Sequence, residues 1–279
     1  MVDWIWRYPL KSAQGESLTS VFVDSDGPTG DRAWAAISAD GAVVSAKNPR
    51  KWGRMLYVSA TINDTARGRE TVVRIPGHTP LTAGTPDADE ALSEWLGARV
   101  RLTSQVPREP RLHRLWPKEP GMIPEWASST AAAGQEEITE ISGATPGGRF
   151  VDFGAVHLVT AGALDALGRD GAPADVRRLR PNLVLSLDRE PSPGDRINVG
   201  PDVTLRVLVP TPRCAVPAAA QPGLEPAPEV LRAIGRHRTE ISGLGQAACF
   251  GTYAQVLSAG HVAVGDRATV AARCRGEDG

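Results

Sequence analysis

The sequence predicts an α+β protein that is mostly β and carries a few peripheral helices. The first hundred residues contain short runs rich in β-branched and aromatic residues, separated by Gly, Pro and Asp, which is typical of strands joined by turns. The second half contains similar runs, with a few segments that carry helix start and stop signals between them. At 279 residues, the chain is long enough for one large domain or two modest ones with a substantial core.

Residues 1–105 are predicted to form an N-terminal β-barrel-like domain. Asp40-Gly41 lies between two of its apolar runs and is a hairpin signal. One helix is expected at 88–96, because acidic residues precede it and Gly97 ends it. Strands are expected at 4–8, 18–24, 32–38, 43–46, 55–62 and 71–75.

Residues 106–149 are predicted to be an irregular connection near the mouth of a cleft, because they are rich in Pro, Glu, Ala and Gly without a sustained period. Residues 150–279 are predicted to form a second β-barrel domain with peripheral helices. Its first helix begins at Thr160, a typical N-cap residue. Further helical turns are expected at 174–179 and 229–234, and strands at 157–159, 183–187, 204–209 and 254–257.

The composition excludes several classes of function. A net charge of −1 provides no cationic excess for general nucleic-acid binding. No segment approaches the roughly 20 apolar residues of a membrane span. The three cysteines form neither a disulfide framework nor zinc-ligand spacing, so a reducing cytoplasm is the expected setting. Lysine is rare, at positions 11, 47, 51 and 118, which gives Lys11 more weight than any single arginine.

Cys214 lies in the segment VPTPRCAVP (209–217), just after a predicted strand and between prolines that cannot continue a ladder. The thiol is therefore expected at a strand end, where the adjacent Arg213 favours a thiolate that can bind a soft metal. On the local sequence alone, the preferred interpretation is a small buried apolar residue. Cys249 and Cys274 are interpreted as structural.

Five further segments stand in a fixed order around Cys214: WRYPLKS (6–12), GDRAW (30–34), LRPNLV (179–184), CFGTY (249–253) and VAVGD (262–266). Together they resemble the MOSC family, which includes the C-terminal domain of molybdenum cofactor sulfurases and the mitochondrial amidoxime-reducing component. The resemblance extends over most of the chain, including the N-terminal β-barrel domain that precedes MOSC in many members.

The resemblance implies a molybdenum cofactor, a pterin dithiolene with a terminal phosphate, held between the two domains. It assigns Cys214 as the metal ligand and a catalytic residue, and it places Asp152 at a catalytic position near the cofactor. Arginine, lysine, serine and asparagine suit the phosphate and the polar pterin edges. The implied cofactor-binding residues are Lys11, Ser12, Arg32, Arg180, Asn182, Arg213 and Tyr253.

Each of these residues also fits a structural role. Lys11 and Ser12 can form a solvated turn, Arg32 can pair with a nearby acid, and Asn182 can bond to neighbouring backbone. His157 lies in an apolar strand and is interpreted as a core histidine, and His237 as part of a solvated charge cluster.

Two segments differ from the pattern of amidoxime-reducing relatives. After the cysteine, a Thr-Thr-x-Asp type of segment is replaced by Pro-Ala-Ala-Ala at 217–220, and the hydroxyl pair expected after Asp152 is replaced by Phe153 and Gly154. These changes are expected to alter substrate positioning or proton delivery beside the metal.

The leading functional hypothesis is a molybdenum-cofactor oxidoreductase that reduces N-hydroxylated or N-oxygenated small molecules with electrons from a separate ferredoxin-like or flavin-dependent donor protein. A second hypothesis is a sulfur carrier that uses a Cys214 persulfide, or a cofactor delivery protein. A third is a repurposed scaffold that acts on a metabolite without molybdenum, which the altered 217–220 segment favours.

Overall fold

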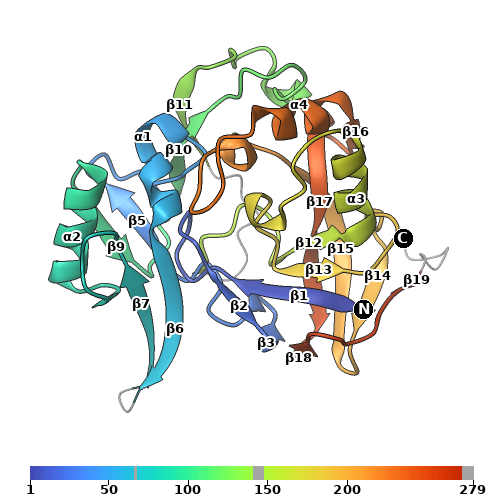
Figure 1. The fold of residues 1–279 in the computed structure, drawn as a ribbon, viewed down its shortest axis with the longest axis horizontal. Helices are drawn as coiled ribbons and strands as arrows, with labels where there is room; N and C mark the ends of the chain where they lie inside the picture. Colours follow the sequence, from blue (N-terminus) through green and yellow to red (C-terminus); the bar gives the residue numbers. More distant parts are fainter. Residues whose placement is uncertain (66–67, 141–147, 272–279) are drawn as a thin grey trace.

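A computed structural model describes residues 1–65, 68–140 and 148–271 as a β-rich α+β fold (Figure 1). Among these residues, the largest sheet has nine strands, and β12 and β13 are its one parallel pair. Its hydrogen-bonded order is β19 (Ala268–Ala271), β14 (Arg196–Val199), β15 (Val203–Pro212), β17 (Gly245–Ser258), β12 (Val156–Thr160), β13 (Leu183–Leu185), β1 (Val2–Arg7) and β2 (Glu16–Leu18), with β16 (Arg238–Ile241) beside β17.

The N-terminal segment is part of this sheet. Strand β1 pairs with β13, and β3 (Ser20–Asp24) pairs with β4 (Gly27–Pro28) and with β18 (Gly260–Ala263) from the other end of the chain. Ile5 and Val23 accordingly lie in the same apolar core as Leu158 and Leu205. The domain boundary at residue 105 stays a prediction, and strands β1 and β3 are joined to the second half by backbone hydrogen bonds.

A second core lies around α2 (Pro86–Leu96), the helix at the left of Figure 1. The predicted helix is confirmed: Thr85 accepts a hydrogen bond from the Ala88 amide, and Gly97 ends the helix in the left-handed conformation at φ 67°. Around it lie β5 (Ala35–Ser38), α1 (Pro49–Trp52), the 3-10 turn η1 (Gly53–Tyr57), β6 (Ser59–Thr65), β7 (Gly68–Arg74), β8 (Leu81–Thr82) and β9 (Val100–Thr103).

The structure corrects three predictions in this half. The predicted barrels are not closed: among the described residues, the strands form one open nine-stranded sheet and several small sheets. Residues 43–46 do not form a strand: Val43 alone forms isolated bridges, to Ile37 on one side and to Leu112 on the other. The first part of the strand predicted at 55–62 is η1, which continues the turn that begins with α1.

The connection at 106–149 is more regular than predicted. Strands β10 (Arg111–Leu115) and β11 (Glu136–Glu140) form an antiparallel pair, with the 3-10 turn η2 (Glu125–Ala127) between them. The amide of Leu115 donates to the carbonyl of Lys47, so β10 lies along the segment that follows Val43. Because β11 alternates exposed and half-buried polar residues, its sequence lacks the apolar alternation by which a strand is recognised.

Helices pack near one end of the large sheet and enclose a third core (Figure 1). Thr160 caps α3 (Ala161–Arg169) as predicted by accepting from the Ala163 amide. The other helical segments are η4 (Val176–Arg178), η5 (Val216–Ala218) and α4 (Pro228–Arg236). No described helix has the length and apolar character that a membrane crossing requires. Cys274 lies outside the described residues.

Candidate functional site

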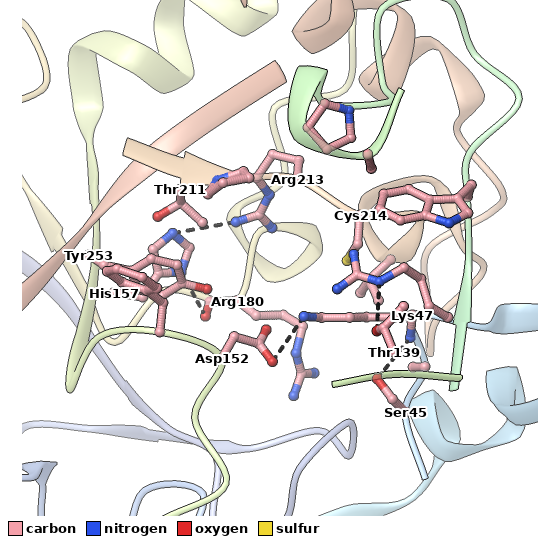
Figure 2. A pocket seen from close by; sticks show the side chains of 18 of the residues that line it. Ser45, Lys47, Thr139, Asp152, His157, Arg180, Thr211, Arg213, Cys214 and Tyr253 are labelled. Atoms are coloured by element: carbon pink, nitrogen blue, oxygen red, sulfur yellow. Dashed lines mark hydrogen bonds and ion pairs between the residues drawn. The ribbon is translucent and has the colours of Figure 1, made fainter. Parts of the chain in front are cut away.

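A cavity of about 490 Å³ lies between the N-terminal segment, the 106–149 connection and the end of β15 (Figure 2). This volume falls within the range of about 300–1,000 Å³ that is usual for small-molecule sites. Eight of the nine predicted site residues line it: Lys11, Ser12, Arg32, Asp152, Arg180, Arg213, Cys214 and Tyr253. The ninth, Asn182, does not line it.

Two lysines share one carboxylate in the cavity wall. The Nζ of Lys11 lies 2.7 Å from Asp152 Oδ1 and also donates to the Phe150 carbonyl at 2.8 Å, while the Nζ of Lys47 lies 3.0 Å from the same Oδ1. The two ammonium groups hold the pKa of Asp152 well below its usual value, although burial acts in the opposite direction. The formal charge of the three groups is positive, because one carboxylate compensates only one of two lysines, although burial lowers the pKa of Lys11.

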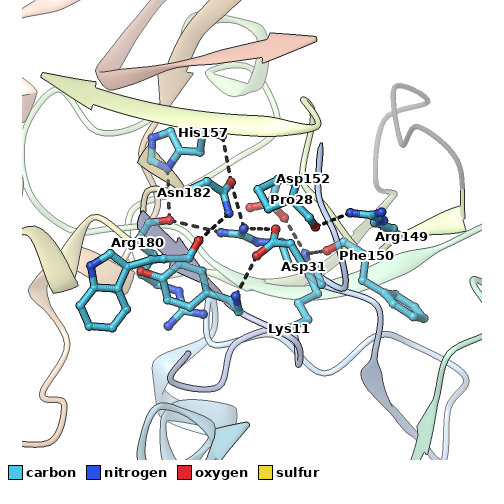
Figure 3. Close-up of polar contacts among 12 residues, drawn as sticks. Lys11, Pro28, Asp31, Arg149, Phe150, Asp152, His157, Arg180 and Asn182 are labelled. Atoms are coloured by element: carbon cyan, nitrogen blue, oxygen red, sulfur yellow. Dashed lines mark hydrogen bonds and ion pairs between the residues drawn. The ribbon is translucent and has the colours of Figure 1, made fainter. Parts of the chain in front are cut away.

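Arg32 is held by the residues beneath the cavity. Its guanidinium forms an ion pair with the buried Asp31 and donates to Asn182 Oδ1 at 3.3 Å and to the Arg180 carbonyl at 3.2 Å. Asn182 Oδ1 also accepts from the His157 amide at 3.0 Å, as Figure 3 shows. Asn182 therefore joins β12 and β13 to Arg32, which is the structural role that its sequence also permitted.

Two guanidinium groups lie over the ring of Tyr8, from Arg180 at 4.4 Å and from Arg32 at 4.9 Å. Tyr8 itself is fully buried. Such cation–π contacts orient a guanidinium without neutralising it. Burial lowers the pKa of Arg180 to about 10, and its Nη2 donates to the Ala13 carbonyl at 2.7 Å.

Backbone strain is concentrated at the cavity. Among the described residues, the non-glycine residues with positive φ are Ser12 at 68°, Arg32 at 48° and Arg180 at 56°, and all three line the cavity. Residues in this region cost free energy and persist where the surrounding structure fixes them, often at functional sites. Ser12 also accepts from the Ala46 amide at 2.9 Å, which fixes the segment that carries Lys47.

His157 is a neutral donor and acceptor between two arginines. Its Nδ1 donates to the Arg180 carbonyl at 3.3 Å, so Nε2 is free to accept from Arg213 at 3.4 Å. Burial and the charges of Arg213 and Arg32 hold the pKa of His157 well below its usual value. The interpretation of His157 as a satisfied core residue is correct, but its ring also lines the cavity.

Cys214 lines the cavity where β15 ends, and it is half-buried against Ala46, Leu56 and Val216. Figure 2 draws it on the same side as Lys47, with His157 and Tyr253 on the other side. Cys249 differs from Cys214, because it is absent from this lining and burial raises the pKa of its thiol to about 12. Burial also raises the pKa of Tyr253, so its phenol keeps its proton.

Comparison with family models gives two matches that together extend over most of the chain. The model of the MOSC domain matches residues 148–269, and the model of the MOSC N-terminal beta barrel domain matches residues 1–106. The chain belongs to the MOSC family. This family assignment confirms the resemblance found in the sequence.

Solved structures and curated proteins add little to this assignment. YiiM from Geobacillus stearothermophilus is 21% identical with a TM-score of 0.32, and the match covers 44% of this chain and 57% of that one. The YUAD protein from Bacillus subtilis is 12% identical with a TM-score of 0.42, and the match covers 96% of this chain and 93% of that one. A search of curated proteins found no significant match.

The altered segment of this MOSC chain lies behind the cavity. Its lining includes Val216, whereas residues 217–220 are absent from it. Arg178 explains this placement, because its guanidinium donates to the carbonyls of Pro217 and Ala219 at 3.3 Å and of Glu225 at 2.6 Å. Residues 217–220 therefore do not line the cavity, although Ala219 packs against the same apolar cluster as Cys214, and their effect on substrate positioning or proton delivery stays a prediction.

The second altered segment has a packing explanation. Phe153 lines the cavity and lies 6.1 Å from Tyr253 between ring centroids. A Cβ at Gly154 would lie 2.7 Å from the Cβ of Tyr253 and 3.2 Å from the carbonyl oxygen of Ala254. Gly154 therefore permits close packing on β17.

Three buried polar atoms on cavity-lining residues of this MOSC chain have no hydrogen-bond partner in the described structure. They are Arg180 Nη1, Arg213 Nε and Thr211 Oγ1. Buried atoms of residues outside the lining, such as Trp52 Nε1, also lack partners, so the fit of a ligand is judged from the groups that line the cavity. A phosphate-bearing pterin has acceptor atoms and Cys214 offers a soft ligand, so the residues present fit a molybdenum cofactor.

Several lining residues were missed in the sequence. Lys47 could have been selected by the same argument as Lys11, because lysine is rare throughout this chain. Thr211 lies three residues before Cys214 but carried no signal of its own. The connection adds Arg114, Trp116, Pro124, Trp126, Ala127, Thr130, Glu137, Thr139 and Glu140, consistent with its expected position near a cleft.

Proposed function

We propose that this chain is an oxidoreductase that binds a molybdenum cofactor in the cavity and reduces N-hydroxylated or N-oxygenated small molecules. One observation carries the proposal: the Cys214 thiol shares a cavity with the cationic side chains of Lys11, Lys47, Arg180 and Arg213. A soft metal ligand beside cationic donors suits a metal dithiolene with a phosphate. Family membership supports the same cofactor.

In this proposal, Cys214 ligates the metal, and the cationic residues bind the phosphate and pterin. Lys11 and Lys47 provide ammonium groups, whereas Arg180 and Arg213 provide planar donor groups. When bound, the cofactor supplies a two-electron redox centre. Asn182 acts indirectly by fixing Arg32, and Ser12 by fixing the segment that carries Lys47.

The reaction breaks the N–O bond of the substrate. Two electrons and two protons enter, the oxygen leaves as water, and the nitrogen remains as an amine or amidine. The chain has only three cysteines, fewer than a four-cysteine iron–sulfur cluster requires, so the electrons come from a separate donor protein.

Two cavity residues are assigned different proton roles. Tyr253 keeps its phenolic proton and can donate a hydrogen bond to the substrate oxygen. Asp152 stays ionised between two lysines, so it is assigned to hold Lys11 and Lys47 in place. This positioning role differs from the catalytic role that the resemblance implies for Asp152.

Metal and pterin analysis tests the proposal. The full chain is produced in a molybdenum-replete host, and its molybdenum, its pterin and any persulfide on Cys214 are measured. We expect molybdenum and pterin in equal amounts and turnover of an amidoxime with a chemically reduced electron donor. A Cys214 persulfide without reductase activity would favour the sulfur-carrier function instead. Protein without molybdenum or pterin would favour a repurposed scaffold.

A further inference from the structure

Part of the cavity lining is apolar. We call Trp116, Trp126, Ile241 and Leu244 the apolar mouth, and all four line the same cavity as Cys214. Trp126 and Leu244 are large apolar side chains that are 42% and 45% exposed. Single exposed apolar residues are ordinary, but two from separate segments that line one cavity indicate a binding surface.

The two segments of the mouth are fixed to each other. Trp126 lies in η2 and Leu244 in the turn between β16 and β17. The carboxylate of Glu125, beside Trp126, accepts a hydrogen bond from the Gln246 amide at 2.8 Å. Gly245 has a φ of 77°, and a Cβ there would lie 2.5 Å from the Glu125 carboxylate. A side chain at this position would displace the Glu125 carboxylate, and the positive φ also favours glycine.

The second tryptophan is oriented by polar contacts. Trp116 Nε1 donates to Glu137 at 2.6 Å, and the Arg114 guanidinium lies over its ring at 4.8 Å. Trp116 is almost fully buried, whereas Trp126 is available to a ligand. An indole surface favours flat aromatic groups, because offset stacking adds to the burial of apolar area.

The geometry points to an aromatic substrate, whose flat apolar body is bound by the mouth while its N-oxygenated head lies toward the cationic residues. This inference rests on the proposed function and defines its substrate class. A small aliphatic N-hydroxy compound would fill only the polar end and leave Trp126 and Leu244 in water. The protein is therefore expected to select among substrates by their apolar body and not by their head group.

Binding of two probes with the same head group tests this inference. Benzamidoxime and acetamidoxime are titrated by calorimetry into the full chain as purified, into Trp126→Ala and into Trp4→Ala. Trp4 is a matched control, because it is 48% exposed and does not line the cavity. We expect tighter binding of benzamidoxime, with the preference reduced about threefold to tenfold in Trp126→Ala and unchanged in Trp4→Ala.

Either of two results would contradict the inference. Equal affinity for the two probes in the unmodified protein, including no binding of either, would overturn the inference, as would a full aryl preference in Trp126→Ala. Leu244→Ala gives an independent variant on the other segment, for which a smaller loss of preference is expected. Molybdenum and pterin content of the same samples tests the proposed function separately.

Discussion

Ion pairs and hydrogen bonds hold the cationic end of the cavity, which also contains residues with positive φ. The apolar mouth is held by a hydrogen bond to one exposed carboxylate and by close packing. Arg32 has an ion pair and two further hydrogen bonds, and it lies on a positive-φ backbone. Trp126 is positioned through the neighbouring Glu125, which accepts from the Gln246 amide and packs against Gly245.

This difference predicts how strongly a substitution in each part of the cavity affects binding. Substituting Arg32, for example, removes a partner from both Asn182 and Asp31 in a connected network, so the effects are expected to be large. Substituting a mouth residue removes apolar surface and few polar contacts, so the effects are expected to be small and specific to the ligand. The predictions below test this contrast, from the largest expected effect to the smallest.

Cys214→Ser is expected to abolish turnover, because a largely protonated hydroxyl replaces a soft thiolate ligand. Molybdenum content should fall, while some pterin stays bound through its phosphate. Cys249→Ser is the matched control and should keep both metal and activity, because Cys249 does not line the cavity. Full amidoxime reductase activity in the Cys214 variant would contradict the assignment of the metal ligand.

Arg180→Lys is expected to weaken pterin binding about tenfold to a hundredfold, the equivalent of one lost charge-assisted contact at about 1.5–3 kcal/mol. Lysine keeps the charge and tolerates the same backbone, but it loses the planar donors and the stacking on Tyr8. Pterin released from the purified protein gives the measurement. Arg177→Lys, an exposed arginine three residues earlier, should leave pterin content unchanged.

His157 makes stability depend on pH. Because its pKa is held well below 6.5 in the folded chain, only the unfolded chain takes up a proton as the pH falls below about 6.5. The free energy of unfolding should therefore decrease with falling pH, by at most about 1.4 kcal/mol per pH unit from this group. Chemical denaturation between pH 5 and 7.5 measures the slope.

The variant His157→Gln isolates this contribution, because it keeps an acceptor toward Arg213 and cannot be protonated. His113 and Glu190 also have shifted pKa values, but both proteins contain them. The difference between the two proteins in the pH dependence of the free energy of unfolding therefore measures the contribution of His157. Identical slopes would show that His157 does not account for the pH dependence.

Glu125→Ala is expected to have the smallest effect. It removes one hydrogen bond, to the Gln246 amide, with a net contribution of about 0.5–1.5 kcal/mol. The aryl preference should decrease less than in Trp126→Ala, while pterin content stays unchanged. A loss of pterin in this variant would show that the mouth and the cationic end are not independent.

Much of the cationic end could be predicted from the sequence. Lys11, Arg32, Arg180 and Cys214 lie in short motifs whose order is characteristic of the MOSC family, and all four line one cavity. Lys47 was missed because no motif contains it, although its contact with Asp152 makes it equivalent to Lys11 there. The apolar mouth was missed because Trp126 and Leu244 belong to segments without apolar periodicity.

The sequence by itself determined the α+β class, helix α2 with its end at Gly97, and the residue types that suit a molybdenum cofactor. Such features depend on local patterns and on motifs that each lie within a few residues. The tertiary structure alone decided that β1 joins the second half, that residues 217–220 turn away toward Arg178, and that Trp126 and Leu244 line the cavity of Cys214. These outcomes depend on hydrogen bonds and packing between residues that are distant in the chain, and no local pattern encodes them.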